Sequence, residues 1–151
     1  MSAAPEGVDW LIALEQIKRL RAIYCRSVDS RDWPRMASIL ADDFVLDMSQ
    51  VQSIMGGPEI RPVVGKAAVM EMFEKGFSHF RKILHIVTIP EIDFQDGENA
   101  TGVWRQETYV KENRPDLPGT GIAYATVFDT YRKEQGQWLF TEVRVRLELI
   151  F

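Results

Sequence analysis

The spacing of apolar residues changes character at about residue 81. Before that point apolar residues recur every three or four positions, as on one face of a helix, and the amino-terminal stretch carries Leu11, Leu14, Ile17, Leu20, Tyr24 and Val28. After that point apolar and polar residues alternate, as on the two faces of a strand. Helices followed by strands are typical of an α+β fold, whereas a βαβ arrangement would mix them throughout the chain. We therefore expect one domain over residues 1–151, in which helices pack on a curved, mainly antiparallel sheet.

Three helices are predicted, mainly in the first half of the chain. The first covers residues 11–28, with Asp9 as its cap, and residues 30–34 break it. Pro34 suits the first turn of a short second helix that runs to about residue 40, with Asp32 beside it as a cap. The third helix covers residues 66–77 and follows a glycine.

About six strands are predicted. Residues 44–48 form the first strand, residues 49–57 a loop, and residues 58–64 a short edge piece, because its two prolines cannot donate to a ladder. Turn signals at residues 96–99, 113–119 and 135–136 delimit four long strands after Arg81, which we expect to be consecutive antiparallel partners. In the last strand, the inward face is predicted to carry Leu139, Thr141, Val143, Val145, Leu147 and Leu149.

The predicted core draws on both halves of the chain. It contains Leu11, Leu14, Tyr24, Phe44, Phe73 and Val145, together with Trp33, Trp104 and Trp138 as core or interface aromatics. Cys25 is expected to be a small buried hydrophobe rather than a nucleophile. Asp42 and Asp43 are interpreted as a solvated turn.

Composition excludes several classes of partner. The formal net charge is −4 and no more than two basic residues are adjacent, so the chain has no electrostatic footprint for nucleic acid or anionic lipid. The apolar runs are too short to cross a membrane, and the start of the chain lacks the features of a signal peptide. With one cysteine and no signal peptide, a cytoplasmic location is expected. The two histidines and scattered carboxylates show no metal-ligand spacing, so we expect no metal site.

Asp29 and His85 are the candidate chemical groups. Asp29 ends the first helical segment, where the negative end of the helix dipole disfavours a carboxylate by about 0.3–1 kcal/mol. His85 lies in the strand-like run of residues 83–89, and a carboxylate facing an imidazole is the minimal general-base constellation. Each residue also has a structural explanation: Asp29 as a solvated residue that begins the turn, and His85 as a half-buried strand histidine with satisfied hydrogen bonds.

Three segments carry a resemblance to a known family: residues 24–33, His85 on its strand, and residues 131–140. Together with the order of elements, they resemble SnoaL-like proteins of the nuclear transport factor 2-like superfamily, over nearly the whole chain. The resemblance implies a cone-shaped α+β barrel around a mostly apolar cavity. The closest pattern is that of scytalone dehydratase and hexachlorocyclohexane dehydrochlorinase, in which a helix-terminal Asp and a strand His form the catalytic dyad. Asp29 and His85 match those two positions.

The chain also departs from those enzymes. The pocket Ser and Asn of scytalone dehydratase fall on Ala125 and Val127, and its second strand histidine has no counterpart in residues 104–110. The helix lysine and late-strand arginine of the dehydrochlorinase fall on Tyr24 and Val143. We therefore expect Ala125, Val127 and Val143 to line the substrate pocket. Tyr24 is a candidate acid or orienting group, although core packing is the leading explanation of its place in the apolar stripe.

Two classes of function follow. The first is a lyase of the dehydratase type, or an isomerase, which acts on a small apolar cyclic substrate with no metal or organic cofactor. The second is a binding or assembly module that keeps the cavity without chemistry. A third, a partner subunit similar to the small subunit of ring-hydroxylating dioxygenases, is weakened by the short chain.

A homodimer or homotrimer is expected, because the outward face of the last strand carries Arg144, Arg146 and Glu148 beside aromatic residues.

Overall fold

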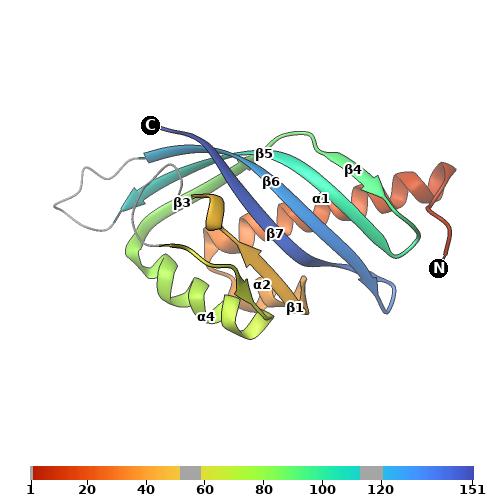
Figure 1. Cartoon of the computed structure of the whole chain (residues 1–151), viewed down its shortest axis with the longest axis horizontal. Helices are drawn as coiled ribbons and strands as arrows, with labels where there is room; N and C mark the ends of the chain where they lie inside the picture. Colours follow the sequence, from red (N-terminus) through yellow and green to blue (C-terminus); the bar gives the residue numbers. More distant parts are fainter. Residues whose placement is uncertain (1, 52–58, 113–120) are drawn as a thin grey trace.

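The structure, a computed structural model, describes residues 2–51, 59–112 and 121–151. The elements follow the chain in this order: α1 (Gly7–Ser30), α2 (Trp33–Ser38), β1 (Leu40–Asp47), β2 (Val63–Val64), α4 (Lys66–Gly76), β3 (Phe80–Val87), β4 (Glu91–Phe94), β5 (Asn99–Glu112), β6 (Gly121–Glu134) and β7 (Gln137–Ile150) (Figure 1). Short 3-10 turns cover Ser49–Val51 and Phe77–His79. None of the helices in these ranges is long and apolar enough to span a membrane.

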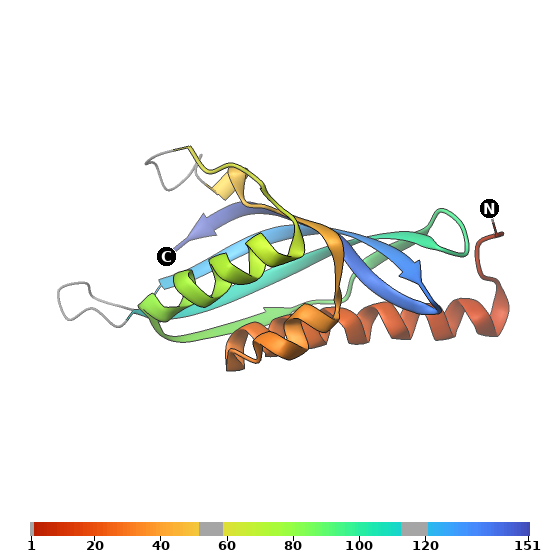
Figure 2. The same ribbon diagram turned by 90° about the horizontal axis from the view of Figure 1, so that it is seen from below.

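The strands form one curved sheet in the order β2-β1-β7-β6-β5-β3, and β4 pairs with β5 next to β3. Every pairing is antiparallel except that of β1 with β7, which is parallel. The edge strands β2 and β3 do not pair with each other, so the sheet is curved but not closed. Figure 2 shows α1 running lengthwise along one side of the sheet, with α4 beside it near the opposite edge. The α+β prediction is therefore confirmed.

α1 is longer than predicted at its amino-terminal end. It begins at Gly7 after Glu6, and neither Glu6 nor Asp9 makes a side-chain cap, so the prediction of Asp9 as cap is wrong. Asp9 lies inside the first turn, where its charge still suits the helix dipole. The helix ends at Ser30, and Arg31 follows in the left-handed conformation with φ 59°. The Asp32 cap of α2 is confirmed, because its carboxylate accepts a hydrogen bond from the Arg35 amide at 3.1 Å.

Two of the predicted strands begin or divide differently. β1 starts at Leu40, and its ladder steps from the pair Leu40 and Phe140 to the pair Val45 and Glu142. Residues 41–44 therefore form a bulge, so Asp42 and Asp43 lie exposed in a strand rather than in a turn. The first of the four predicted long strands is divided into β3 and β4, and both pair with β5. Pro90 lies in the break and has no amide to donate.

The inward-facing residues of β7 change from even-numbered to odd-numbered positions along the strand. Tyr131 pairs with Phe140 and Thr130 with Glu142, so Thr141 has no partner on β6 and forms a bulge. Glu148 forms a second bulge, between Leu147 and Leu149. Each bulge moves the following residues to the other face. Trp138 and Phe140 are therefore buried before the first bulge, and Val143 and Leu147 after it. The prediction that Leu139 and Leu149 face inward is wrong.

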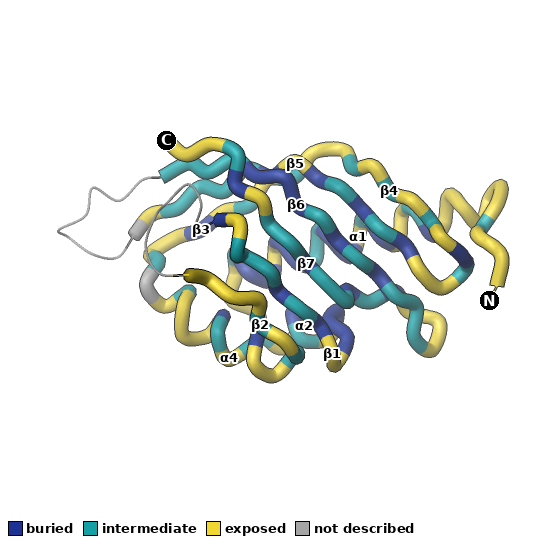
Figure 3. The backbone as a smooth tube through the Cα atoms, viewed as in Figure 1, coloured by how far each residue is buried: buried dark blue, intermediate teal, exposed yellow. Residues whose placement is uncertain are grey.

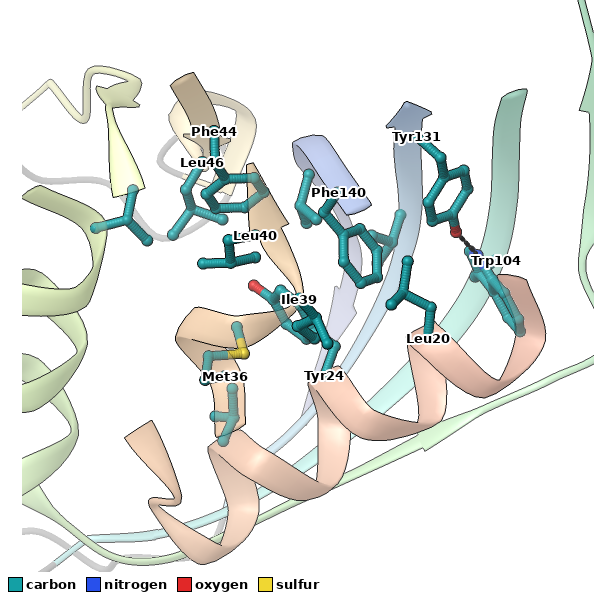
Figure 4. Packing of buried hydrophobic residues seen from close by; sticks show 14 of the residues in the cluster. Leu20, Tyr24, Met36, Ile39, Leu40, Phe44, Leu46, Trp104, Tyr131 and Phe140 are labelled. Carbon is teal, nitrogen blue, oxygen red and sulfur yellow. Dashed lines mark hydrogen bonds between the residues drawn. The ribbon is translucent and has the colours of Figure 1, made fainter. Parts of the chain in front are cut away.

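The core lies between the sheet and the helices. Tyr24, Phe44 and Phe73 belong to its buried cluster as predicted, and Val145 packs against it. Leu20 and Tyr24 of α1 point toward Phe140 of β7 (Figure 4), and the rings of Tyr24 and Phe140 meet edge to face at 5.2 Å. The three predicted core tryptophans are confirmed: Trp104 and Trp138 are buried, and Trp33 stacks on Phe73.

Leu11 and Leu14 do not join this core. Leu11 is 54% exposed, and Leu14 is half-buried outside the cluster. Of residues 7–14, only Ala13 is buried, and this end of α1 is largely exposed (Figure 3). Ala13 is 7% exposed, and residues two positions apart are about 200° apart around a helix, so Leu11 points away from the covered face.

A buried polar network crosses the core. Arg21 donates to the Asp129 carboxylate at 3.4 Å, and Tyr131 donates to the other oxygen of Asp129 at 2.7 Å. The Trp104 indole donates to the Tyr131 hydroxyl at 3.1 Å, as the dashed line in Figure 4 shows. Burial raises the pKa of Asp129 above its ordinary value, against the opposing effects of the Arg21 cation and the Tyr131 hydroxyl. Burial alone would lower the pKa of Arg21, but the charge of Asp129 and its other neighbours raise it.

Two substitutions test the extent of the core. Phe44→Ala removes a ring that is 0% exposed, and we expect it to lower the free energy of unfolding by about 3–5 kcal/mol. Leu11→Ala removes an exposed side chain and should change that free energy by less than about 0.5 kcal/mol. Urea denaturation followed by circular dichroism measures both, and a comparable loss in the two variants would contradict this description of the core.

The buried carboxyl of Asp129 should give stability a specific pH dependence. Its folded-state pKa is raised, so the stability that protonation contributes is complete below the ordinary pKa of 3.8 and is lost as the pH rises through the folded-state pKa. Wild type should therefore lose stability relative to Asp129→Asn between pH 4 and pH 7. Urea denaturation of both proteins across this range measures the difference, and a relative gain by wild type would mean that Arg21 outweighs burial.

Candidate functional site

A cavity of about 530 Å³ opens between the concave face of the sheet and the helices. Its walls are mostly apolar, and every layer of the fold contributes to them. The apolar lining includes Val28 of α1, Leu46 of β1, Phe73 of α4, Ile83 of β3, Val110 of β5, Ala125 of β6, and Val143 and Leu147 of β7. A cavity of this size and character suits a small organic molecule.

Strand register brings the few polar groups of the sheet wall together. His85 of β3 is paired with Thr108 of β5, which is paired in turn with Ala123 of β6. The next row on the same face contains Gln106 and Ala125, because residues two apart on a strand share a face. All five residues line the cavity.

Asp29 and His85 are hydrogen-bonded at the edge of this cavity. Asp29 Oδ1 lies 2.5 Å from His85 Nδ1, and Asp29 Oδ2 accepts from the backbone amide of His85 at 3.0 Å. The side chains are 15% and 11% exposed, respectively. One carboxylate thus holds both the ring and the backbone of His85.

This contact explains a carboxylate in the last turn of α1. The two hydrogen bonds from β3 compensate the unfavourable helix dipole, and Arg31 donates to the carbonyl oxygen of Phe80 at the start of the same strand. An ionised carboxylate only accepts hydrogen bonds, so Nδ1 carries the proton that faces Asp29. In the neutral ring, Nε2 then keeps its lone pair, and it makes no hydrogen bond to any residue in the described ranges.

Tyr24 lines the cavity and also belongs to the core cluster. Burial raises the pKa of its hydroxyl, so the group is protonated at neutral pH and can donate a hydrogen bond. Its ring packs edge to face on Phe73 and Phe140. Both interpretations of Tyr24 from the sequence, as a packing residue and as a polar group at the cavity, are compatible with this position.

The three predicted pocket residues separate into two groups. Ala125 and Val143 line the cavity. Val127 does not; it is 0% exposed and lies in the core cluster. It shares the inward face of β6 with Ala125 but pairs with Trp104, where core side chains fill the space between the sheet and α1.

Sequence reasoning missed three polar residues at the cavity, Arg21, Gln106 and Thr108. Arg21 is 1% exposed and donates to the Gln106 side-chain oxygen at 2.6 Å, and Gln106 donates to the Thr108 hydroxyl at 3.2 Å. The guanidinium also lies 4.7 Å from the centre of the Tyr24 ring. The available signal was helical spacing, because Arg21 precedes Tyr24 by three residues and Val28 by seven, and so shares their apolar face.

Cys25 is buried as predicted, and burial raises the pKa of its thiol, which disfavours the thiolate. Within the described parts of the chain, no group of three or more His, Cys, Asp or Glu residues is arranged to hold a metal ion.

Comparison with solved structures places this geometry in a known fold. A protein from Novosphingobium aromaticivorans DSM 12444, provisionally assigned as a scytalone dehydratase, aligns with a TM-score of 0.81 at 21% identity, over 93% of this chain and 87% of that one. Hexachlorocyclohexane dehydrochlorinase LinA-type3 from Novosphingobium barchaimii LL02 aligns with a TM-score of 0.80 at 18% identity, over 95% and 92%. A provisionally assigned aromatic ring hydroxylase, also from Novosphingobium aromaticivorans, aligns with a TM-score of 0.76 at 19% identity, over 91% of each chain.

These likenesses show a shared α+β cone fold. At the level of sequence, the model of one family, described as SnoaL-like domain, matches residues 10–144. That match covers most of the chain, from α1 into β7. The chain therefore belongs to the family of SnoaL-like domains.

Proposed function

We propose that this protein is a cofactor-independent lyase of the dehydratase type, or an isomerase, in which Asp29 and His85 remove a proton from a small, largely apolar cyclic substrate. The observation that carries the proposal is the 2.5 Å contact between Asp29 and His85 at the wall of a predominantly apolar cavity. The elimination reactions in the names of two structural neighbours, a dehydratase and a dehydrochlorinase, support the same class of chemistry.

In this mechanism His85 is the general base. Asp29 holds the Nδ1–H tautomer, so the Nε2 lone pair is available to take a proton from a carbon acid in the cavity. The imidazolium that forms is stabilised by the adjacent carboxylate. The electron pair of the broken C–H bond then forms a double bond as a leaving group departs from the neighbouring carbon, or the carbon is reprotonated elsewhere in the isomerase variant. Such proton transfer contributes roughly 10²–10⁴-fold to a rate.

The remaining site residues have supporting roles in the proposal. Tyr24 is the candidate acid or orienting group, because its hydroxyl is kept protonated by burial at the cavity wall. Ala125 and Val143 supply apolar contact for the substrate, at positions where scytalone dehydratase and the dehydrochlorinase have polar residues. These replacements favour a substrate different from those of the two enzymes.

The dyad is tested by removing each of its functional groups. His85→Gln and Asp29→Asn should each lower turnover by at least ~100-fold while leaving ligand affinity much less affected, because the lost groups act in the chemical step. Hydrogen–deuterium exchange and elimination on a panel of cyclic carbon acids, followed by NMR in D₂O, measure turnover. Asp42→Asn, which changes an exposed carboxylate on β1, is the matched control.

If a substrate is found and neither dyad variant slows it, the mechanism is wrong. If ligands bind tightly and wild type turns over none of them, the protein is instead a small-molecule-binding or assembly module with the same fold.

We also propose that the protein forms a homodimer or homotrimer through the outer face of β6 and β7. Arg144 and Arg146 lie over the Phe128 ring at 4.7 and 5.3 Å, and Leu149, paired with Tyr124, is 55% exposed. Such a mixture of aromatic, arginine and aliphatic groups is typical of the centre of an interface.

Leu149→Lys should shift the protein toward monomer, because it places a charge in the proposed contact. Val8→Lys, at the exposed amino-terminal end of α1, should leave assembly unchanged. Sedimentation equilibrium measures both, and a wild-type protein that is monomeric at every concentration would refute the assembly.

A further inference from the structure

We propose that the Thr108 hydroxyl is a hydrogen-bond donor directed at the ligand beside His85, so that the protein selects ligands with an acceptor oxygen, such as a ring carbonyl, over plain or halogenated hydrocarbon rings. The binding preference stands by itself, and its catalytic consequence rests on the proposed function. Neither Thr108 nor its partners Gln106 and Arg21 was identified from the sequence.

The polarity of the Thr108 hydroxyl is fixed by a chain of hydrogen bonds that begins at Arg21. A guanidinium can only donate, so the atom of Gln106 that lies 2.6 Å from Arg21 Nη2 must be the amide oxygen. The Gln106 amide nitrogen is then the group that donates to Thr108 Oγ1 at 3.2 Å. The threonine oxygen is therefore used as an acceptor, and its own hydrogen has no acceptor among the described residues.

Burial makes this polarity stable. Arg21 is 1% exposed, and Asp129 holds it from the core side at 3.4 Å. Gln106 is 8% exposed, so water has little access to replace either of its hydrogen bonds. Reversing the chain would leave a guanidinium facing an amide N–H group, at the cost of an unpaired buried donor.

The sheet register places the Thr108 hydroxyl beside His85. His85 and Thr108 are direct partners across β3 and β5, and both line the cavity. Side chains of directly opposed residues have Cβ atoms about 4.5–5.5 Å apart. An acceptor oxygen bound by Thr108 would thus lie beside the carbon atom that His85 approaches.

This arrangement matches the charge that proton removal creates. When His85 takes the proton from a carbon next to a carbonyl, the C–H electron pair forms a carbon–carbon double bond and the carbonyl π pair moves onto oxygen. A hydrogen bond from Thr108 strengthens as that oxygen becomes negative, and no further reactant is required. A hydrocarbon or halocarbon ring would instead leave the hydroxyl without an acceptor in an apolar cavity.

Binding of indan-2-one and indane, which differ by a carbonyl oxygen, tests the preference. Thr108→Val keeps the shape of the side chain and should weaken indan-2-one binding about 5- to 20-fold, while indane binding stays the same or tightens. Thr108→Ser should keep the wild-type ratio of the two affinities. Isothermal titration calorimetry, or NMR titration for weak binding, measures them.

Two further variants separate the role of the hydrogen-bond chain from general damage. Gln106→Glu should reproduce the effect of Thr108→Val, because a carboxylate beside the hydroxyl can only accept and would take its hydrogen. Thr101→Val is the matched control, since Thr101 lies on the same strand, accepts from the Gln95 amide at 3.1 Å, and is not part of the cavity lining.

An unchanged ratio of affinities in Thr108→Val would overturn the inference. Deuterium exchange at the acidic CH₂ groups of indan-2-one distinguishes this failure from a failure of the proposed function. Exchange that requires His85 but not Thr108 supports the dyad and overturns the role of Thr108. A Thr108-dependent preference for the ketone without exchange supports the role of Thr108 in recognition and contradicts catalysis by the dyad.

Discussion

The packing of α1 against the concave side of the sheet is the constraint on which the rest of the structure depends. The same helix supplies Tyr24 to the core, Arg21 to the buried network and Asp29 to the contact with His85. Arg21 and Tyr24 are three positions apart and share a helix face, and the regular helix fixes the direction of Asp29 relative to them. A rotation of α1 would therefore disturb the core and the candidate site together.

Buried polar groups give this otherwise apolar interior its specificity. Burying the Arg21 guanidinium is unfavourable unless partners satisfy it, and Asp129 and Gln106 provide them from two neighbouring strands. Because a guanidinium only donates, Gln106 accepts from Arg21 with its oxygen and donates to Thr108 with its nitrogen. The network therefore fixes which atoms of the cavity wall donate and which accept. The partners that satisfy the buried charge of Arg21 thus also fix the hydrogen-bonding groups at the cavity.

Bulges keep apolar side chains on the inward face along the whole length of β7. β1 and β7 change register where the sheet bends, and the extra residues Thr141 and Glu148 exchange the faces of β7. Phe140 therefore points inward before the first bulge, and Val143 and Leu147 point inward after it, where they line the cavity. Val143 also belongs to the core cluster. Simple alternation does not anticipate this exchange, which is why Leu139 and Leu149 were assigned to the wrong face.

The sequence by itself determined the fold class, the helices and most strands, because periodicity and turn residues are local properties of the chain. The pairing of Asp29 with His85, 56 positions apart, was suggested only by the family resemblance. Only the tertiary structure decided that Leu11 is exposed, that Val127 belongs to the core, and that Arg21, Gln106 and Thr108 form one hydrogen-bonded chain at the cavity. Those outcomes depend on which face of α1 the sheet covers, where the cavity gives way to packed side chains, and which distant residues meet, such as Arg21 and Gln106, 85 positions apart. They are decided by packing and register over long sequence separations, which no local pattern encodes.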